Sequence, residues 1–400
     1  MTSSLATSSP AVRSFQTGLH HRPGTVVVPG TTDEVARTLA GAARSGAPVT
    51  VHATGHGLTD PADGGILLVT TGMNEIVVDP EAGTARIGAG ATWADVVAAT
   101  APHGLRPPNG SAPSVGVAGY LFGGGLGLTA RSDGWAADHV RAFELVTADG
   151  IVRTVDAATD PGEFARLRGT GPSGGAVVTT VTLGLLPAGP LTGGGLVRVL
   201  GPADGPGDAG PLHAWHAWTR SLPDDITSGL SLVPYPDLPF LPGHLRGRRV
   251  LRIAAVVTGD EERARELLAP LRAAIDFDED AVAALDPADS ARVYAEPDVP
   301  HAYVGDDHLV ADLDPAGLDA VARRSGPMVV TGIRHLGGAA GRAPAVPDTV
   351  RGRDASYLVN ALAPFDGDPS EARAGVRGVL DGFASRSLGT QAAFRFGLVG

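Results

Sequence analysis

The sequence predicts an α+β protein built from two domains. Its 400 residues, 43% of them hydrophobic, suffice for two or even three hydrophobic cores. Residues 25–53 follow a strand–helix–strand pattern, and strands separated by helices occupy the second half of the chain. A segment rich in Gly and Pro, residues 188–210, lies between the two halves. We therefore expect a flexible N-terminus over residues 1–22, a first domain over 23–190 and a second over 191–400.

The first domain opens with the run "TVVVP", whose β-branched side chains favour a strand. Thr31 stands three residues before Glu34, which is the pattern of a capping box, and an Ala-rich helix is expected to follow. The run "APVTVHA" then predicts a second strand. This unit delivers residues 51–60, "VHATGHGLTD", to the end of a strand, where ligands of α/β layers usually bind.

The middle of the first domain mixes short strands with one segment of a different kind. Strands are expected at "ILLVTT", "EIVVDP" and "TARIGAG", and a helix over residues 92–101. Residues 104–127 hold too many Gly and Pro for either regular element but are apolar, so we expect buried backbone wrapped around a ligand. The Asp149-Gly150 pair predicts a hairpin, "DPGEFARLRG" a short helix, and "GGAVVTTVTLGLLP" a long strand that ends the domain.

The second domain is expected to form a sheet with one face covered by helices. Its strands are predicted at "SGLSLVPYP", "RRVLRIAAVVTG", "MVVTGIRHLGG" and "SYLVNALAP". Helices are predicted at "DEERARELLAPLRAAI", "PAGLDAVARRSG" and "PSEARAGVRGVLDGFASRS". Trp215 and Trp218, three residues apart on a further helix, are expected to be core.

The composition excludes several classes of function. The net charge is −12 with no basic block, so neither nucleic acid nor an anionic membrane is an expected partner. The absence of Cys excludes thiolate nucleophiles and Fe–S clusters, and the absence of Lys excludes a Schiff base and a P-loop lysine. No signal peptide and no apolar run of about 18 residues are evident. We expect a cytoplasmic monomer or homodimer.

His52 and His56 lie four residues apart, as two metal ligands on a helix would. Gly55 and the preceding strand argue against a helix, and the glutamate of an HExxH motif is missing, so no metal site is expected. A plain structural loop remains the alternative. The run "GPSGG" formally matches a nucleophile elbow, but the expected helix precedes it and the strand follows it, which is the reverse of the required order.

Two further motifs leave alternatives open. Residues 125–130, "GLGLTA", fit a relaxed dinucleotide fingerprint, yet neither a strand before them nor an ordinary helix after them is expected. A nicotinamide-binding Rossmann domain is therefore a minor alternative, although clustered glycines can still bring backbone N–H groups close to a pyrophosphate. His335 and Tyr357 are either hydrogen-bonded core side chains or polar groups that face a substrate.

Together these segments resemble the berberine bridge enzyme-like flavoproteins of the vanillyl-alcohol oxidase and p-cresol methylhydroxylase (PCMH) superfamily. The resemblance runs from about His21 to the end and is strongest between Pro23 and Pro187. It implies a PCMH-type FAD-binding domain followed by an α/β substrate domain, with an antiparallel sheet covered by helices. "VHATGHG" is similar to the loop around the FAD pyrophosphate, and His56 matches the histidine that binds the flavin 8α-methyl group covalently.

Further segments carry the same resemblance. "GSAPSVGVAGYLFGGGLG" is similar to the second flavin-wrapping motif, with Ala112 where doubly tethered members have Cys, so a single covalent link is implied. "GWAADHVRAFELVTADG" resembles the segment on the adenine side, and "EFARLRGTGPSGGAVVT" the stretch that closes over the cofactor. The implied FAD-binding residues are His52, Ala53, Thr54, Gly55, His56, Gly57, Gly110, Ser111, Val115, Gly116, Gly119, Tyr120, Gly123, Gly124, Gly125, Val140, Gly175 and Val177.

The resemblance also implies an activity. A small Val115 beside the flavin implies access for dioxygen, hence an oxidase that takes hydride from an alcohol or activated C–H of a specialised metabolite or sugar and releases hydrogen peroxide. Tyr357, Tyr120 and His335 are the expected proton acceptors, in that order.

Three features depart from the family pattern. His52 and Thr54 replace Arg or Gly of the pyrophosphate loop, and Ser173 and Gly174 replace an Asn-Phe pair. Residues 391–393, expected on the last strand, lack the usual Tyr and Asn, and no return helix follows. A cyclase that uses flavin as a scaffold and a flavin-free metabolite-binding module are therefore the alternatives.

Overall fold

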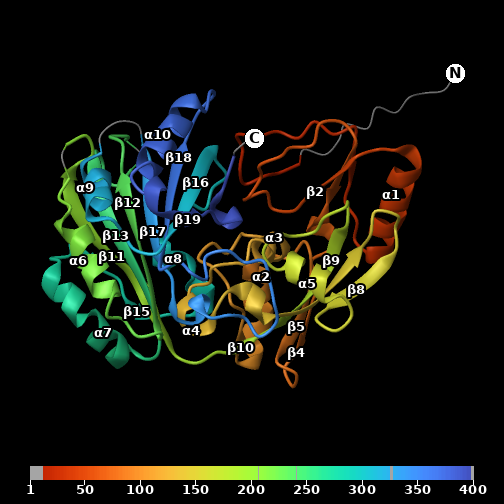
Figure 1. The fold of residues 1–400 in the computed structure, drawn as a ribbon, viewed down its shortest axis with the longest axis horizontal. Helices are drawn as coiled ribbons and strands as arrows, with labels where there is room; N and C mark the ends of the chain where they lie inside the picture. Colours follow the sequence, from red (N-terminus) through yellow and green to blue (C-terminus); the bar gives the residue numbers. More distant parts are fainter. Residues whose placement is uncertain (1–11, 206, 240, 325–327, 398–400) are drawn as a thin grey trace.

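The computed structural model describes residues 12–205, 207–239, 241–324 and 328–397, and it places two domains side by side (Figure 1). The first domain carries short helices with sheets of three, five and two strands, and the second is built on one large sheet. No helix in this part of the chain has the length and apolarity needed to cross a bilayer.

The strand–helix–strand unit forms as predicted at the start of the first domain. β1 (Thr25–Val27) and β2 (Val49–His52) both pair in parallel with β3 (Ile66–Val69). The side chain of Thr31 caps α1 (Thr32–Ser45) by accepting a 3.3 Å hydrogen bond from the backbone N–H of Glu34.

A five-stranded antiparallel sheet forms the rest of the first domain. The predicted hairpin joins β7 and β8, with Gly150 at a positive φ of 89° in its turn. Trp93, Phe143 and Phe164 lie in the hydrophobic core on this sheet. In sheet order, the strands are β4 (Ile76–Asp79), β5 (Thr84–Gly88), β9 (Val177–Gly184), β7 (Val140–Val146) and β8 (Val152–Asp156). The helices of this part of the domain are α2 (Trp93–Thr100) and α5 (Pro161–Leu167).

The glycine-rich segment 104–127 is less irregular than predicted. It contains β6 (Leu105–Arg106), paired with β10 (Leu186–Pro187), and the short helix α3 (Val117–Phe122). α3 forms because three of its apolar side chains are buried, and glycines stand immediately before and after it. The four-residue helix α4 (Ala130–Asp133) follows.

The described part of the N-terminus is ordered, which corrects the prediction of a flexible segment up to residue 22. Gln16 is completely buried, and its side-chain amide donates a 2.6 Å hydrogen bond to the carbonyl of Tyr303. Packing between two domains thus orders a Ser- and Thr-rich sequence that local propensity leaves undefined. Residues 1–11 lie outside the described residues.

The second domain is a nine-stranded antiparallel sheet with helices on one face (Figure 1). The core between sheet and helices includes Trp215 and Trp218, as predicted. The strands are β11 (Leu191–Pro202), β12 (Ile226–Pro234), β13 (Arg248–Thr258), β14 (Glu279–Asp280), β15 (Ala283–Ala284), β16 (Tyr303–Val310), β17 (Val330–His335), β18 (Tyr357–Pro364) and β19 (Ser387–Gly389). The helices are α6 (Gly210–Thr219), α7 (Glu261–Ala274), α8 (Ala291–Tyr294), α9 (Pro315–Arg323) and α10 (Ser370–Leu380).

The segment rich in Gly and Pro between the two halves contains β11, which pairs along its length with β13. Its glycines serve close packing rather than turns. A Cβ at Gly194 would lie 2.2 Å from the carbonyl oxygen of Ala281, and one at Gly195 would lie 2.4 Å from the Arg252 guanidinium. Close contact with other chain segments therefore explains the high glycine content of this strand.

The second domain returns a long segment across the first. The indole N–H of Trp135 donates to the carbonyl of Ala340 at 2.9 Å, and the guanidinium of Arg168 donates to the carbonyl of Val346 at 2.9 Å. Arg131, almost fully buried, donates to the carbonyl of Ile226 at 3.0 Å. These long-range contacts hold the two domains on either side of a shared cavity.

Candidate active site

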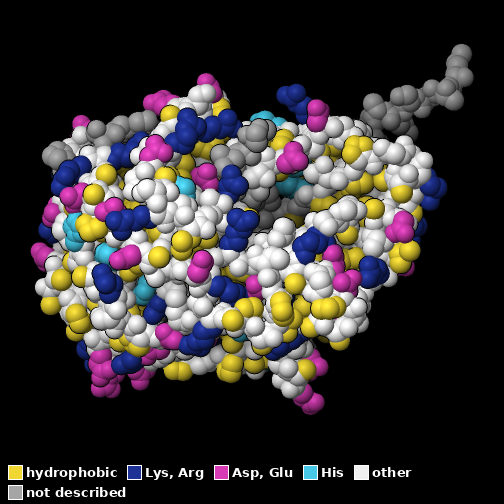
Figure 2. Space-filling model, viewed as in Figure 1, with side chains coloured by type: hydrophobic (Ala, Val, Ile, Leu, Met, Phe, Trp, Pro, Cys, Tyr) yellow, Lys and Arg dark blue, Asp and Glu magenta, His cyan; other side chains and the backbone are white. Residues whose placement is uncertain are grey.

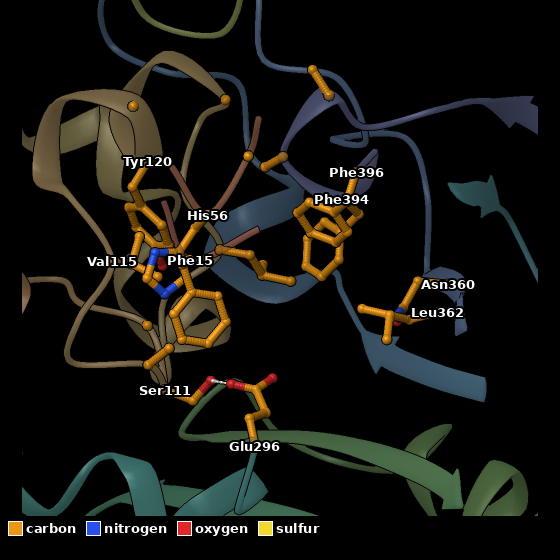
Figure 3. Close-up of a pocket in the computed structure, with 18 of the residues that line it drawn as sticks. Phe15, His56, Ser111, Val115, Tyr120, Glu296, Asn360, Leu362, Phe394 and Phe396 are labelled. Carbon is orange, nitrogen blue, oxygen red and sulfur yellow. Dashed lines mark hydrogen bonds between the residues drawn. The ribbon is translucent and has the colours of Figure 1, made fainter. Parts of the chain in front are cut away.

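A cavity of about 860 Å³ lies between the two domains, and Figure 2 shows a hollow in the surface there. Its first wall consists of the loop after β2 and the segment around α3. Its second wall consists of β12, β17 and β18 of the large sheet, and residues from both ends of the chain complete it (Figure 3). This volume lies in the upper part of the ~300–1,000 Å³ range of small-molecule sites.

The loop after β2 is shaped by its glycines. Gly55 adopts a positive φ of 75°, and a Cβ there would lie 2.1 Å from the Ser14 hydroxyl and 2.7 Å from the His52 ring. A Cβ at Gly57 would meet no atom within 4 Å, so this backbone opens onto the cavity. The predicted loop residues 52–57 all line the cavity.

His56 extends from this loop between two hydroxyl groups. Its Nδ1 lies 3.2 Å from the hydroxyl of Thr54 and its Nε2 lies 3.1 Å from that of Ser114. Burial, with a smaller contribution from His301, lowers the pKa of His56 to about 4. The imidazole is therefore neutral near pH 7 and retains a nitrogen lone pair.

His52, whose role the sequence left open, is buried and faces away from His56. Its Nδ1 lies 3.1 Å from Nε2 of His21, and its Nε2 lies 3.1 Å from the carbonyl oxygen of Arg13. No group of three or more His, Asp or Glu side chains in the described residues is placed to hold a metal ion. His52 is thus part of a hydrogen-bonded connection to the N-terminal segment.

The second predicted motif lies beside this loop on the same wall, where the N–H of Gly116 donates to the Thr54 hydroxyl at 3.3 Å. Ser111 and Val115 line the cavity, as do Tyr120 and the glycines at 110, 116, 119 and 123. A Cβ at Gly119 would meet nothing within 4 Å, so a second stretch of backbone opens onto the cavity. Gly125, at a φ of 71°, lies behind the cavity wall, where a Cβ would be 2.4 Å from the Tyr120 ring.

Five of the predicted cofactor-binding residues, Gly125 among them, do not line the cavity, which corrects the expectation for these positions. Gly124 lies beside Gly125 and packs against Val350 and Trp135. Val140 and Val177 lie in hydrophobic cores under the five-stranded sheet, and Gly175 forms the turn that precedes β9. Alternation along β7 and β9 places both valines on buried positions.

Tyr120 lies in α3, and its hydroxyl is fully buried without a hydrogen-bond partner among the described residues. Its ring contacts Trp93 edge-on, at a centroid distance of 5.2 Å. Burial, reinforced by the nearby Glu296 and Tyr294, raises the pKa of Tyr120 far above its usual range. This phenol keeps its proton and can donate a hydrogen bond to a bound group.

Tyr357 does not face the cavity, which corrects its expected role. Successive residues of β18 alternate between the two faces of the sheet, so Asn360 and Leu362 line the cavity whereas Tyr357 lies in the helix-covered core. Its hydroxyl lies 2.9 Å from that of Thr219 in α6. The alternative that Tyr357 is a hydrogen-bonded core side chain is thereby confirmed.

His335 reaches the margin of the cavity and stacks on Tyr357 at a centroid distance of 5.4 Å. Burial, with the nearby Arg131 charge, lowers its pKa to about 3. Nε2 accepts a 3.2 Å hydrogen bond from Arg131, so the single proton of the neutral ring resides on Nδ1. Neither nitrogen has a free lone pair, and His335 is not arranged as a proton acceptor.

The large sheet presents polar groups that the sequence analysis missed. The amide oxygen of Asn360 is buried without a partner, over Gly332 of the neighbouring strand. Arg334 stacks on the Tyr294 ring at 3.6 Å and pairs with Glu296 at 3.4 Å. Strand periodicity was the available signal for Asn360, because its position is three residues from Tyr357 and hence on the opposite face.

Both ends of the chain contribute aromatic rings to the cavity (Figure 3). Phe15 comes from the ordered N-terminal segment, and Phe394 and Phe396 follow β19. The predicted last strand is shorter than expected: β19 ends at Gly389, and Ala392–Phe394 form a single 3-10 turn. The backbone N–H of Gln391 leaves the strand because it donates to the Asp307 carboxylate at 2.8 Å.

Comparison with known proteins is consistent with this geometry. A family model described as an FAD binding domain matches residues 23–156. An FAD-dependent monooxygenase of Fusarium proliferatum is 36% identical over 177 residues, which are 43% of this chain and 34% of that protein. The (R)-6-hydroxynicotine oxidase of Paenarthrobacter nicotinovorans is 35% identical over 178 residues, which are 44% of this chain and 39% of that protein. The matched region thus spans little more than a third of the length of these curated relatives.

Solved structures extend the similarity to both domains. A 6-hydroxy-D-nicotine oxidase from Arthrobacter nicotinovorans superposes with a TM-score of 0.77 at 25% identity, covering 94% of this chain and 83% of that one. Residues 23–156 thus carry an FAD-binding domain, and the chain is similar to FAD-linked oxidoreductases of the berberine bridge enzyme-like type. Two structures share its fold at 18% identity: a chitooligosaccharide oxidase, with a TM-score of 0.81 over 96% of this chain and 85% of its own, and the Physcomitrella patens BBE-like 1 protein, with 0.79 over 95% and 85%.

The residues present fit FAD as the cofactor of this chain. Two stretches of glycine backbone, at Gly57 and Gly119, open onto the cavity, and backbone N–H groups in such loops bind pyrophosphate without a lysine. The unpartnered hydroxyl of Tyr120 and the neutral ring of His56 lie on the same wall.

Proposed function

We propose that this chain is an FAD-dependent oxidase that acts on a small, largely apolar alcohol or activated C–H compound, with its flavin attached to His56. The bound flavin supplies the hydride acceptor and passes two electrons to dioxygen. The substrate thereby loses a hydride and a proton, and dioxygen gains both as hydrogen peroxide. The neutral His56 imidazole on the cavity wall is the observation that carries the proposal.

The attachment to His56 is supported by the ring's environment. The hydroxyls of Thr54 and Ser114 contact its two nitrogens, and burial keeps it unprotonated near pH 7. A lone pair is the requirement for bond formation to a flavin methyl group. Ala112 offers no second nucleophile, so a single link is expected, which would raise the flavin potential and favour hydride acceptance.

Reoxidation by dioxygen is supported by Val115, which lines the cavity next to His56 (Figure 3). In the berberine bridge enzyme-like family, which this chain resembles, a small side chain at the position that Val115 matches leaves a path for dioxygen. A larger side chain there would fill that space.

The substrate class follows from the wall opposite the flavin-binding loops. Leu362, Phe394 and Phe396 present apolar surface, and Asn360 supplies one amide group that can orient a substrate oxygen or nitrogen. Arg334, the cationic side chain on this wall, is already paired with Glu296. This lining favours an apolar specialised metabolite over a sugar, whose many hydroxyls would lack partners.

Glu296 is our candidate for the proton acceptor. Tyr357 lies outside the cavity, Tyr120 holds its proton tightly, and His335 has no free lone pair. Glu296 lines the cavity and accepts a 2.6 Å hydrogen bond from Ser111 in the flavin-wrapping motif. A carboxylate held at the junction of both walls can take a proton from a substrate bound between them.

A cyclase that retains oxidised flavin is the second candidate. Gln391, Ala392 and Ala393 stand where many members of the family that the chain resembles carry a Tyr and an Asn, so the usual catalytic side chains are missing at these positions. Such a protein would bind the same flavin and the same apolar class of substrate, but no electrons would reach dioxygen.

The decisive experiment is anaerobic mixing of the purified yellow protein with a panel of apolar alcohols and cyclic amines. Bleaching of the flavin absorbance by a substrate, followed by one equivalent of peroxide on admission of air, supports the oxidase. Product formed while the flavin stays oxidised would favour the cyclase. Protein purified without flavin would refute both and favour a flavin-free binding module.

Two variants complete this test. Flavin should remain with acid-precipitated wild-type protein but not with His56→Ala. Glu296→Gln should slow anaerobic bleaching by about 10²–10⁴-fold, the usual contribution of a general base, while FAD stays bound. Retention of flavin by precipitated His56→Ala would contradict the attachment site.

A further inference from the structure

We propose that the N-terminal clasp, defined as Arg13–Thr17, is a positioning element that fixes the imidazole of His56 for flavin attachment. Within it, the ring of Phe15 stacks on that of His56 with centroids 3.9 Å apart and planes inclined by 11° (Figure 3). This inference rests on the attachment proposed above, and it assigns a function to a segment that the sequence predicts to be flexible.

The backbone of the clasp follows the flavin loop and determines where Phe15 lies. The N–H of Phe15 donates to the carbonyl of Thr54 at 3.0 Å, and that of Gln16 donates to the carbonyl of Gly55 at 3.2 Å. The Ser14 hydroxyl donates to the same Gly55 carbonyl at 3.2 Å. The phenyl ring is therefore held by three hydrogen bonds to the residues immediately before His56.

A relay of two histidines fastens the start of the clasp. The backbone N–H of Ala62 donates to Nδ1 of His21 at 2.9 Å, so the proton of neutral His21 is on Nε2 and is donated to Nδ1 of His52. Nε2 of His52 then carries its own proton and donates it to the carbonyl of Arg13. Burial lowers the pKa of both histidines, in agreement with two neutral rings.

The other side of the clasp is anchored to the second domain. Thr17 and Phe15 exchange backbone hydrogen bonds with His301, each of 3.0 Å. The amide of Gln16 donates to the carbonyl of Tyr303, and the Tyr303 hydroxyl donates to the carbonyl of His56 at 2.6 Å. The clasp therefore connects the loop after β2 to β16. The hydroxyl of Tyr303, in β16, also contacts the backbone of His56 itself.

The stack matters because the remaining contacts of the His56 ring are adjustable. The hydroxyls of Thr54 and Ser114 can rotate to follow the ring, whereas a parallel phenyl ring restricts its plane. Attachment forms one N–C bond at the 8α-methyl group and breaks one C–H and one N–H bond. The two electrons and two protons pass to the flavin ring, and dioxygen then accepts them. This step requires the nitrogen lone pair to point at the methyl carbon.

The test compares Phe15→Ala and Phe15→Tyr with wild type, and uses Phe164→Leu as a matched control. Phe164 is buried in the first-domain core and does not line the cavity. Total FAD is measured by absorbance after gel filtration, and covalent FAD by fluorescence of the protein band on a denaturing gel. Thermal unfolding monitors folding in each variant.

Phe15→Ala should retain most of the total FAD but lose at least about five-fold in the covalent fraction, whereas Phe15→Tyr and Phe164→Leu should resemble wild type. An unchanged covalent fraction in Phe15→Ala would overturn the clasp while leaving the attachment at His56 intact. Wild-type protein without covalent flavin would overturn both. Should Phe15→Ala not fold, His52→Ala removes the fastening at Arg13, and the same loss of covalent fraction is expected.

Discussion

The Ser111 hydroxyl donates a 2.6 Å hydrogen bond to the Glu296 carboxylate across the boundary between the two domains (Figure 3). Glu296 is also paired with Arg334, so one carboxylate joins the flavin-wrapping motif to the substrate sheet. The two domains thus meet at the position where we place proton transfer, and the geometry of the active site depends on how they dock.

This contact should couple the two residues energetically. In a double-mutant cycle with Ser111→Ala and Glu296→Ala, measured by urea unfolding, we expect an interaction energy of about 1 kcal/mol or less, because Glu296 is partly exposed. Ser221→Ala is the matched control, since its hydroxyl bonds locally to the carbonyl of Trp218. In a second cycle with Ser221→Ala and Glu296→Ala, the two losses of stability should simply add. Equal interaction energies in the two cycles would argue against a specific link between Ser111 and Glu296.

Enlarging Val115 should separate reoxidation from substrate oxidation. Val115→Ile fills space next to His56, so the rate at which dioxygen reoxidises reduced flavin should fall at least about ten-fold, because the larger side chain blocks access. The reduction of an artificial electron acceptor should be retained. Stopped-flow reoxidation measures both rates. Val330→Ile, on the opposite wall, is the control and should leave reoxidation unchanged. Equal rates in Val115→Ile and wild type would refute the dioxygen path.

Removing the Tyr357 hydroxyl should affect stability and not chemistry. Tyr357→Phe loses the 2.9 Å hydrogen bond to Thr219 in the buried core, so unfolding should require about 1 kcal/mol less. The rate of anaerobic flavin bleaching should stay within about two-fold of wild type, since the side chain does not touch the cavity. A loss of 100-fold or more would restore Tyr357 as a catalytic residue.

Asp307 should make stability depend on pH. The side chain is fully buried in β16, and burial raises its pKa to about 7, although the N–H of Gln391 partly opposes this. Between its unfolded pKa near 3.8 and about 7, the folded state binds the proton more strongly than the unfolded state. The contribution of this group to stability is therefore complete at low pH and is lost as the pH rises through 7.

Asp307→Asn should remove that part of the pH dependence. Urea unfolding would be measured at pH 5 and pH 8. Between these two pH values, Asp307→Asn should lose less free energy of unfolding than wild type does. The amide oxygen of the variant can still accept from Gln391. Asp306→Asn, partly exposed and paired with Arg395, serves as the control and should keep the wild-type difference. A steep loss in Asp307→Asn would assign the dependence to another group.

The elements that the sequence predicted correctly depend on short-range patterns. The β1–α1–β2 unit follows from β-branched runs and the Thr31 cap, and the hairpin at Gly150 from its turn pair. The predicted loops at residues 52–57 and around Ser111 do line one cavity. β11 and the clasp were missed because glycines near other chain segments, and Ser or Thr near a terminus, have the same local composition as a linker.

By itself, the sequence predicted an FAD-binding first domain and two glycine-rich segments that line one cavity, because glycine spacing and residue type are local properties of the chain. Only the tertiary structure decided that Asn360 rather than Tyr357 faces the cavity, and that Phe15 stacks on His56. These outcomes depend on which face of a sheet the helices cover and on contacts such as Gln16 to Tyr303, which join residues 287 positions apart. Neither a periodicity nor a motif encodes such pairings, because they arise only when the two domains pack together.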